Sequence, residues 1–287
     1  MNMSEECFVK IVSDLNKWRD DREPFLKVIR LYLEGEPLVN KNFCNMLKIL
    51  KENNFAERIE LVTNGSLLNK KVAEKIVECG LDYICISIYS INKEKNKQIT
   101  NSEIDPELIK ENVKYLKQVR EYRRKDRPYI YAKIINTFNE QENEEFKKYY
   151  STVVDEVAIQ EPMDWNSSEE GKFIDKLYND KSIAEDVKKK IASREERRVC
   201  PYPFHTLSIK SNGDVLVCCI DWLRGTKVGN VFENTLEEIW NGKLLYQFRK
   251  MHIEGRRSNN LSCEHCNYLN ALREEDNLDE LTLDKLK

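Results

Sequence analysis

The sequence predicts an α/β protein, in which strands and helices alternate up to about residue 161 and a small cysteine-rich extension with a β-hairpin follows. Apolar residues change repeatedly between the strand period of 2 and the helix period of 3.6. Such alternation implies parallel strands joined by crossover helices. Five of the nine cysteines lie in the last third of the chain. We expect a barrel-like parallel sheet; an open sheet has the same periodicity and stays an alternative.

Local signals mark where the first elements begin and end. Ser4 is a suitable N-cap for the first helix. Asn64-Gly65 follows a strand, and Gly80 can end a helix. The strands are expected at residues 27–33, 59–63, 83–88, 129–135 and 153–159, and the later helices around residues 43–50, 72–77, 106–119 and 141–150.

The composition changes in the second half of the chain. Asn212-Gly213 between two apolar runs predicts a hairpin with a type I′ turn. Thr235 and Glu238 have the spacing of a capping box for a short helix. The charged stretch before the hairpin is expected to hold one or two helices, and the acidic tail from Arg273 a surface helix. We divide the chain into residues 1–163 (βα part), 164–199 (helical connection), 200–268 (cysteine-rich part) and 269–287 (tail).

Bulk composition limits the classes of partner. The 47 basic and 50 acidic residues give a net charge of −3, which gives no reason to expect nucleic acid. The N-terminal residues lack the basic and apolar regions of a signal peptide. The chain holds no apolar run of the ~20 residues needed to cross a bilayer. We therefore expect a cytoplasmic protein without a membrane partner, whose thiols stay reduced.

Polar residues follow each of the expected strands. Ligands bind at the carboxyl ends of strands in parallel βα folds. Gly35-Glu36-Pro37 places a carboxylate on a stiff backbone, where it suits an ammonium or hydroxyl ligand. The other candidates are weaker, because strands often end in such residues. The candidate ligand-binding residues are Gly35, Glu36, Pro37, Thr63, Asn64, Ser87 and Asn136.

The cysteines of the last third predict a metal centre. Cys263-x-x-Cys266 lets two sulfurs bind one metal or cluster from a tight turn. Cys200 precedes the hairpin, and Cys218 is expected on its second strand next to Cys219. Neighbours on a strand point to opposite faces, so we favour Cys218 as ligand and keep Cys219 as the candidate to exchange with it. Four thiolates suit either an iron–sulfur cluster or zinc.

The remaining cysteines and histidines carry no separate signal. Cysteine is commonly buried as a small apolar residue, and we expect that of Cys85. Residues 83–88 alternate, so isoleucines should face helices while Cys85 and Ser87 face the interior of the barrel. We expect structural roles for Cys7, Cys44 and Cys79, an exposed His265, and no assigned role for His205 or His252.

Together these motifs resemble the radical S-adenosylmethionine superfamily with a C-terminal SPASM extension. Glu34 to Leu38 resembles its Gly-Glu-Pro motif, residues 60–68 its third barrel strand and loop, and Ile86-Ser87-Ile88 its fourth strand. The extension resembles SPASM from Cys200-Pro201 through Gly213, five positions before Cys218, to Cys263-x-x-Cys266.

The resemblance implies a partial (β/α)₆ TIM-like barrel and one auxiliary [4Fe–4S] cluster. It implies Cys200, Cys218, Cys263 and Cys266 as cluster ligands, and S-adenosylmethionine at the strand ends. A complete member cleaves S-adenosylmethionine reductively and abstracts hydrogen from a peptide, protein or sugar, with electrons from a donor such as flavodoxin or ferredoxin. No residue here chooses among these substrates.

One departure from the family pattern bears on activity. The family's Cys-x₃-Cys-x₂-Cys is absent, because no three of the nine cysteines have that spacing. We expect a chain that lacks the first barrel strand and the cluster loop together, as a truncated chain would. It should not cleave S-adenosylmethionine by itself, so whether it is an enzyme stays open. Two alternatives remain: a non-catalytic peptide or small-molecule binding module with a structural cluster, and a zinc-stabilised interaction protein.

Overall fold

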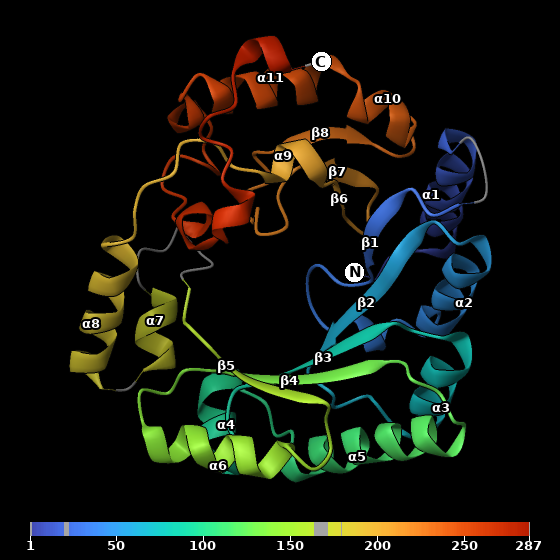
Figure 1. Ribbon diagram of the computed structural model, residues 1–287, viewed down its shortest axis with the longest axis vertical. Coiled ribbons are helices and arrows are strands. Elements are labelled where there is room, and N and C mark those ends of the chain that lie inside the picture. The colour runs from blue at the N-terminus through green and yellow to red at the C-terminus, as the bar shows by residue number, and fades with distance from the viewer. Residues whose placement is uncertain (1, 20–22, 164–171, 179, 287) are drawn as a thin grey trace. The chain divides into compact units, whose positions relative to one another are not determined.

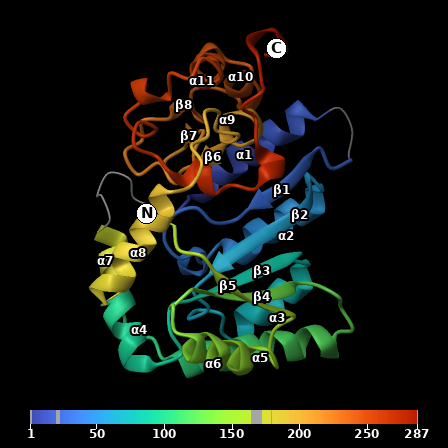
Figure 2. The same ribbon diagram turned by 60° about the vertical axis from the view of Figure 1, so that its left-hand side comes forward.

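The structure, a computed structural model, describes residues 2–19, 23–163, 172–178 and 180–286 and forms two compact units. One unit comprises residues 19–161, here called the βα unit. The other, here called the C-terminal unit, contains the first helix and the residues from 162 onward. Figures 1 and 2 show the elements of both units from two directions.

The βα unit contains five parallel strands in the order in which they occur along the chain. Right-handed crossovers between strands in consecutive order place every connecting helix on the same face of the sheet. Figure 1 accordingly shows the helices on the outer side of a curved sheet, so the predicted α/β class is confirmed. The elements are β1 (Leu26–Arg30), η1 (Pro37–Val39), α2 (Phe43–Asn53), β2 (Ala56–Thr63), α3 (Lys70–Cys79), β3 (Tyr83–Ile88), α4 (Lys93–Thr100), α5 (Pro106–Tyr122), β4 (Tyr129–Ile135), α6 (Glu140–Tyr150) and β5 (Glu156–Gln160).

The core of the βα unit lies between the sheet and its helices. Ile84 and Ile86 of β3 are fully buried, as are Val113 and Leu116 of α5. Each such side chain stabilises the fold by about 1.5–3 kcal/mol relative to an exposed one. The isoleucines of β3 therefore face helices, as their alternation predicts.

Several details of the βα unit differ from the sequence expectation. β1 ends at Arg30, three residues before its expected end, and β2 begins at Ala56, three residues before its expected start. α4 was not foreseen, because its one buried residue is Asn96 and it has no apolar face to detect. β5 begins three residues later than expected, since Val153 and Val154 are buried in the turn that follows α6.

An ion pair between Arg120, which is buried, and Asp155, whose side chain is 21% exposed, joins α5 to the edges of β4 and β5. Arg120 donates to Asp155 (Nη2 to Oδ1, 2.8 Å) and to the Pro128 carbonyl (2.9 Å). The N–H of Ile130 also donates to the Asp155 carboxylate, at 2.7 Å. Burial opposes ionisation of Asp155, but the hydrogen bonds from Arg120 and Ile130 outweigh it and lower the pKa of the carboxyl. The pair therefore stabilises the charged form of Asp155.

Asp155→Asn should destabilise the βα unit by about 2–3 kcal/mol at neutral pH, because the buried Arg120 loses its counter-charge. A carboxyl with a lowered folded pKa contributes stability above its unfolded pKa of about 3.9, and this is lost as pH falls through the folded value. Urea unfolding at neutral and acidic pH measures both effects. Glu111→Gln, at an exposed position of α5, is the control. Equal stability of the two variants at neutral pH would contradict this role.

The C-terminal unit is built around a small antiparallel sheet of order β6-β7-β8. The first helix of the chain belongs to this unit: α1 packs on α10, with the rings of Trp18 and Trp240 6.4 Å apart. Chain order places this helix with residues 1–163, because the sequence alone does not show where its apolar face is buried. The elements are α1 (Glu5–Trp18), α7 (Lys172–Leu177), α8 (Lys181–Ala192), α9 (Tyr202–His205), β6 (Ser208–Ile209), β7 (Asp214–Leu216), β8 (Lys227–Asn230), α10 (Leu236–Trp240), α11 (Lys243–Ile253), η2 (Arg257–Asn259), η3 (Tyr268–Ala271), η4 (Glu274–Asp276) and η5 (Leu283–Lys285).

The hairpin forms with a different turn and shorter strands than expected. A type I′ turn needs positive φ at two residues, but here only Gly213 has it, at 86°. Its N–H donates to the Lys210 carbonyl at 3.0 Å, which closes a wider loop. The predicted capping box is confirmed at the start of α10, where Thr235 and Glu238 bond each other's backbone.

The helical connection before the cysteine-rich part forms as predicted, whereas the tail does not form the predicted helix. α7 and α8 form the expected helical connection and share a small core that includes Ile174, Val187 and Ile191. The expected surface helix of the tail is wrong, because the structure has only the short turns η4 and η5 there. Asp279 instead accepts hydrogen bonds from the N–H groups of Arg198 (3.0 Å) and Val199 (2.7 Å), which holds the tail extended.

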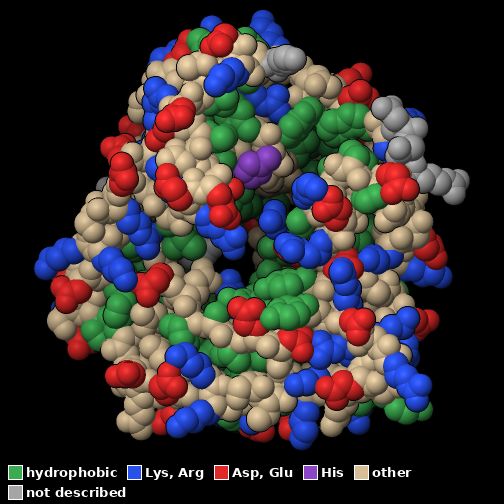
Figure 3. Space-filling view, viewed as in Figure 1, with side chains coloured by type: hydrophobic (Ala, Val, Ile, Leu, Met, Phe, Trp, Pro, Cys, Tyr) green, Lys and Arg blue, Asp and Glu red, His purple; other side chains and the backbone are tan. Residues whose placement is uncertain are grey.

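The surface carries both signs of charge. Figure 3 shows Lys and Arg interspersed with Asp and Glu over the visible face, in keeping with the net charge of −3. Within the part of the chain that the structure describes, no helix is long and apolar enough to cross a membrane.

Candidate metal centre

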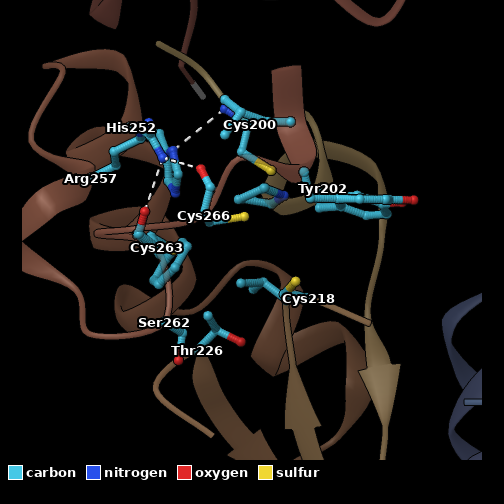
Figure 4. A pocket seen from close by; sticks show the side chains of 14 residues that line it. Cys200, Tyr202, Cys218, Thr226, His252, Arg257, Ser262, Cys263 and Cys266 are labelled. Atoms are coloured by element: carbon cyan, nitrogen blue, oxygen red, sulfur yellow. Dashed lines mark hydrogen bonds between the residues drawn. The ribbon is translucent and has the colours of Figure 1, made fainter. Parts of the chain in front are cut away.

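Four of the five candidate cysteines line one cavity in the C-terminal unit (Figure 4). Cys200 lies two residues before α9, and Cys218 lies two residues after β7. Cys263 and Cys266 lie in the turn between η2 and η3. Thiols from three separate segments, up to 66 positions apart, are therefore brought to one place, which is the arrangement that the sequence predicts.

Backbone groups of the protein are already aimed at two of these sulfurs. The N–H of Tyr202 donates to the sulfur of Cys200, and the N–H of Ile220 to that of Cys218. Hydrogen bonds from N–H groups favour the charged form of a sulfur. The two loops are thus shaped to hold thiolates.

Burial of the cysteine sulfurs disfavours negative charge on them. Burial raises the pKa of the Cys200 and Cys263 thiols to about 12, and it also raises the pKa of Cys218. The neighbouring sulfurs raise these values further, while Arg257 opposes the rise at Cys200 and Cys263. A bound cation would favour the thiolate forms, because its charge offsets the desolvation.

The spacing of the donors bears on which group fits. Zinc needs its donors at about 2.0–2.3 Å from a single ion, whereas a [4Fe–4S] cluster takes one thiolate at each of four irons. Four separate thiols around one cavity fit the donor pattern of a cluster.

Cys219 lies differently from its neighbour. It is half-buried and does not line the cavity; its sulfur instead hydrogen-bonds Tyr202. Both cysteines follow the end of β7, so the strand alternation from which we argued does not apply to them. The preference for Cys218 stays a prediction, supported by its position at the cavity.

Arg257 fixes the Cys-x-x-Cys turn. Its Nη1 donates to the carbonyls of Cys263 (2.9 Å) and Cys266 (2.8 Å), and its Nη2 donates to Glu196 (3.0 Å). These bonds hold both cysteines of the turn to one rigid guanidinium. No sequence pattern indicates this role, since Arg257 lies outside the Cys-x-x-Cys motif.

Asp221 joins the loop after Cys218 to the segment that carries Cys263 and Cys266. Its buried carboxylate accepts hydrogen bonds from the N–H (2.7 Å) and hydroxyl (2.7 Å) of Thr226, the N–H of Gly225 (3.2 Å) and the hydroxyl of Ser262 (2.6 Å). The loop after Cys218 is thereby connected to the residue before Cys263.

His252 also lines the cavity, although the sequence assigned it no role. The N–H of Cys200 lies 3.4 Å from its Nδ1, and its Nε2 has no hydrogen-bond partner among the described residues. Burial lowers the pKa of His252 to about 4 and the charge of Arg257 lowers it further, while the Arg198 carbonyl acts in the opposite direction. The imidazole is therefore neutral at pH 7.

The predicted ligand residues of the βα unit form a hydrogen-bonded edge. The Glu36 carboxylate accepts from the Thr63 hydroxyl (2.7 Å), the Asn64 N–H (2.8 Å) and the Leu38 N–H (3.0 Å). Gly35 before it has φ of 73°, a conformation that favours glycine. A carboxylate has about four acceptor positions, so Glu36 keeps the capacity for one more donor.

Ser87 and Asn136 lie at neighbouring strands but are engaged within the protein. Ser87 hydrogen-bonds the buried Cys85, which shows that both lie on one face of β3, as predicted. The amide of Asn136 donates to Glu161 (3.0 Å) and accepts from Asn143 (3.0 Å). Their role toward a ligand stays a prediction.

The fold and the cavity together define an α/β protein with a four-cysteine centre appended to a parallel sheet. The family model of the radical SAM superfamily matches residues 14–146, and that of SPASM, an iron–sulfur cluster-binding domain, matches residues 200–267. The chain thus contains a radical SAM superfamily segment followed by a C-terminal SPASM domain. The first match contains all predicted strand-end residues, and the second all five candidate cysteines.

Two curated relatives match the chain at low sequence identity or over a short overlap. It is 24% identical over 275 residues to a tungsten-containing aldehyde ferredoxin oxidoreductase cofactor-modifying protein of Pyrococcus furiosus, covering 86% of this chain and 75% of the relative. A probable GTP 3′,8-cyclase of Methanocaldococcus jannaschii is 38% identical over 66 residues, which cover 23% of this chain and 22% of the relative.

Solved structures show the same fold. Native anSMEcpe with bound AdoMet has a TM-score of 0.58 at 15% identity, with 87% of this chain and 75% of that chain covered. BtrN in complex with AdoMet and 2-DOIA has a TM-score of 0.54 at 17% identity, with 92% and 80% covered. Streptococcus suis SuiB bound to S-adenosylmethionine has a TM-score of 0.56 at 17% identity, with 94% and 65% covered.

Proposed function

We propose that this chain binds one [4Fe–4S] cluster through Cys200, Cys218, Cys263 and Cys266 and takes part in radical S-adenosylmethionine chemistry on a peptide, protein or small molecule. The observation that carries the proposal is the meeting of these four thiols at one cavity inside the segment that matches the cluster-binding domain. When bound, the cluster supplies an electron acceptor or donor. The residues of this chain hold it, exclude water from it and fix its position.

S-adenosylmethionine is assigned to the edge formed by Gly35, Glu36, Pro37, Thr63 and Asn64. Glu36 suits the ammonium group of the methionine part, because it retains an acceptor position at the end of β1 and β2. Ser87 and Asn136 are proposed to face the same ligand. Three similar structures hold AdoMet, which supports this assignment.

The proposal gives this chain no cluster that reduces S-adenosylmethionine. None of its nine cysteines has the Cys-x₃-Cys-x₂-Cys spacing. A small donor protein such as flavodoxin or ferredoxin is the proposed electron source. The substrate class rests on the neighbours: anSMEcpe is described with a peptide, and BtrN with 2-DOIA.

Metal analysis tests the cluster. After anaerobic purification and reconstitution, we expect about four irons and four acid-labile sulfides per chain, as the cluster formula requires. Stoichiometric zinc without sulfide would instead establish a zinc-stabilised protein. Tight peptide binding in the absence of any S-adenosylmethionine binding would favour a non-catalytic binding module.

Glu36→Gln should weaken binding of S-adenosylmethionine about tenfold, because the variant keeps the shape of the side chain and loses the charge that faces the ammonium group. Isothermal titration calorimetry of the reconstituted protein measures this. Glu52→Gln, at an exposed position of α2, is the matched control and should leave affinity unchanged. Equal affinities of the Glu36→Gln and Glu52→Gln variants would contradict the assignment, without affecting the cluster.

A further inference from the structure

Buried His252 presents an unpaired ring nitrogen at the wall of the four-cysteine cavity. Its side chain on α11 is 1% exposed, and its Nε2 has no hydrogen-bond partner among the described residues. Figure 4 shows the ring beside the cysteines that line the same cavity. Leaving a buried polar atom unpaired is unfavourable, so this nitrogen suits a partner that the described residues do not supply.

The contact at Nδ1 indicates whether Nε2 is a hydrogen-bond donor or acceptor. The N–H of Cys200 approaches Nδ1 at 3.4 Å, which occupies the lone pair of that atom. A neutral imidazole has one donor and one acceptor nitrogen. The Arg198 carbonyl is a competing acceptor for a ring proton, but the Cys200 contact has hydrogen-bond geometry with Nδ1 as the acceptor. With Nδ1 as acceptor the ring proton lies on Nε2, which makes His252 a hydrogen-bond donor at this nitrogen.

The cationic side chain at the site, Arg257, donates its hydrogen bonds to other groups of the protein. Arg257 donates Nη1 to two carbonyls of the cysteine turn and Nη2 to Glu196. It therefore acts on the cavity as a fixed positive charge held by the backbone. His252 is left as the buried side chain whose donor has no partner among the described residues.

We propose that His252 donates its Nε2–H to a sulfur of the cluster held by Cys200, Cys218, Cys263 and Cys266, and that this bond raises the reduction potential of the cluster. The inference rests on the proposed function, since it needs a cluster at this site. Reduction adds negative charge to the sulfurs, and a hydrogen bond to them stabilises the reduced form more than the oxidised form. His252 is thus a positioning and tuning residue, while the cysteines are the ligands.

Three substitutions distinguish the contribution of Nε2 from that of Nδ1. His252→Gln retains a donor near the position of Nε2, and His252→Asn retains an acceptor near that of Nδ1. His252→Leu removes both. We expect the Asn and Leu variants to shift the reduction equilibrium about tenfold toward the oxidised cluster, or ~59 mV for one electron. The Gln variant should stay close to wild type.

The measurement is an EPR-monitored redox titration of each reconstituted protein, with iron and sulfide determined first. Wild-type potentials in all three variants would overturn the proposal. A shift in the Gln variant with none in the Asn variant would also overturn it, because the effect would then come from the contact with Cys200. A wild-type chain without iron and sulfide would instead disprove the proposed function itself.

A measurement on the unaltered protein covers the case in which the variants do not load a cluster. Electron–nuclear double resonance of the reduced wild-type protein in H₂O and D₂O should reveal an exchangeable proton coupled to the cluster. Its absence would overturn the proposal. So would the strong nitrogen coupling of a ligating imidazole, since Nδ1–H would then donate to the Arg198 carbonyl and Nε2 would bind iron.

Discussion

Cys218→Ser should remove most of the bound iron and sulfide, whereas Cys219→Ser should leave both close to wild type. Cys218 lines the cavity with Cys200, Cys263 and Cys266, and its sulfur receives the N–H of Ile220. A cluster that loses one of four thiolates loses the contact that fixes one iron to the chain. Iron and sulfide analysis after anaerobic reconstitution measures the loss, and the visible absorption of the cluster follows it.

Cys219 is a matched control for Cys218. Cys219 differs by one position in sequence but is not among the residues that line the cavity; its sulfur hydrogen-bonds Tyr202, which does line it. Cys44→Ser, on α2 of the βα unit, controls for the general effect of removing a half-buried thiol. Full loading of the Cys218→Ser variant together with loss of iron from the Cys219→Ser variant would exchange the two assignments.

The fold could be predicted because its signals are local. Each strand of the parallel sheet shows its own apolar run, and each helix that was predicted between them shows apolar residues at helical spacing. α4 was missed for the same reason: Asn96 is its one buried residue, so the helix has no apolar stripe. The tail was assigned a helix on spaced leucines, but the hydrogen bonds from residues 198 and 199 to Asp279 decide its conformation. Those bonds join positions about 80 residues apart and leave no local pattern.

The cysteines of the candidate centre could be predicted, and the residues that support them could not. Cysteine spacing in a reducing location is a signal in itself. A single histidine on an amphipathic helix is no such signal. The importance of His252 becomes visible only because the fold brings it next to Cys200, 52 positions earlier. Arg257 is one of 47 basic residues until the structure shows two cysteine carbonyls at its guanidinium. Supporting residues act through tertiary contacts, which a sequence pattern of this length does not encode.

Asp221→Asn should destabilise the C-terminal unit by about 3 kcal/mol and make the cluster labile. Asp221 is 3% exposed, and its two oxygens accept four hydrogen bonds. The donors are the backbone of Gly225 and Thr226 and the hydroxyls of Thr226 and Ser262. Asparagine replaces one oxygen by an NH₂ group, which faces donors and leaves at least one of them unpaired. An unsatisfied buried donor and the loss of a charged acceptor together account for a cost of this size.

The effect on the cluster follows from where these donors lie. Thr226 and Gly225 belong to the loop that follows Cys218, and Ser262 directly precedes Cys263. Loosening this connection lets the two cysteine segments separate, so the rate of iron release to a chelator should rise about tenfold or more for a cost above about 1.4 kcal/mol. Chelator-driven iron release and urea unfolding of the metal-free chain measure the two effects. Asp186→Asn, at a position of α8 whose side chain is 80% exposed, is the control in the same unit. If the Asp221→Asn variant released iron no faster than this control, the carboxylate would not be what holds the two segments together.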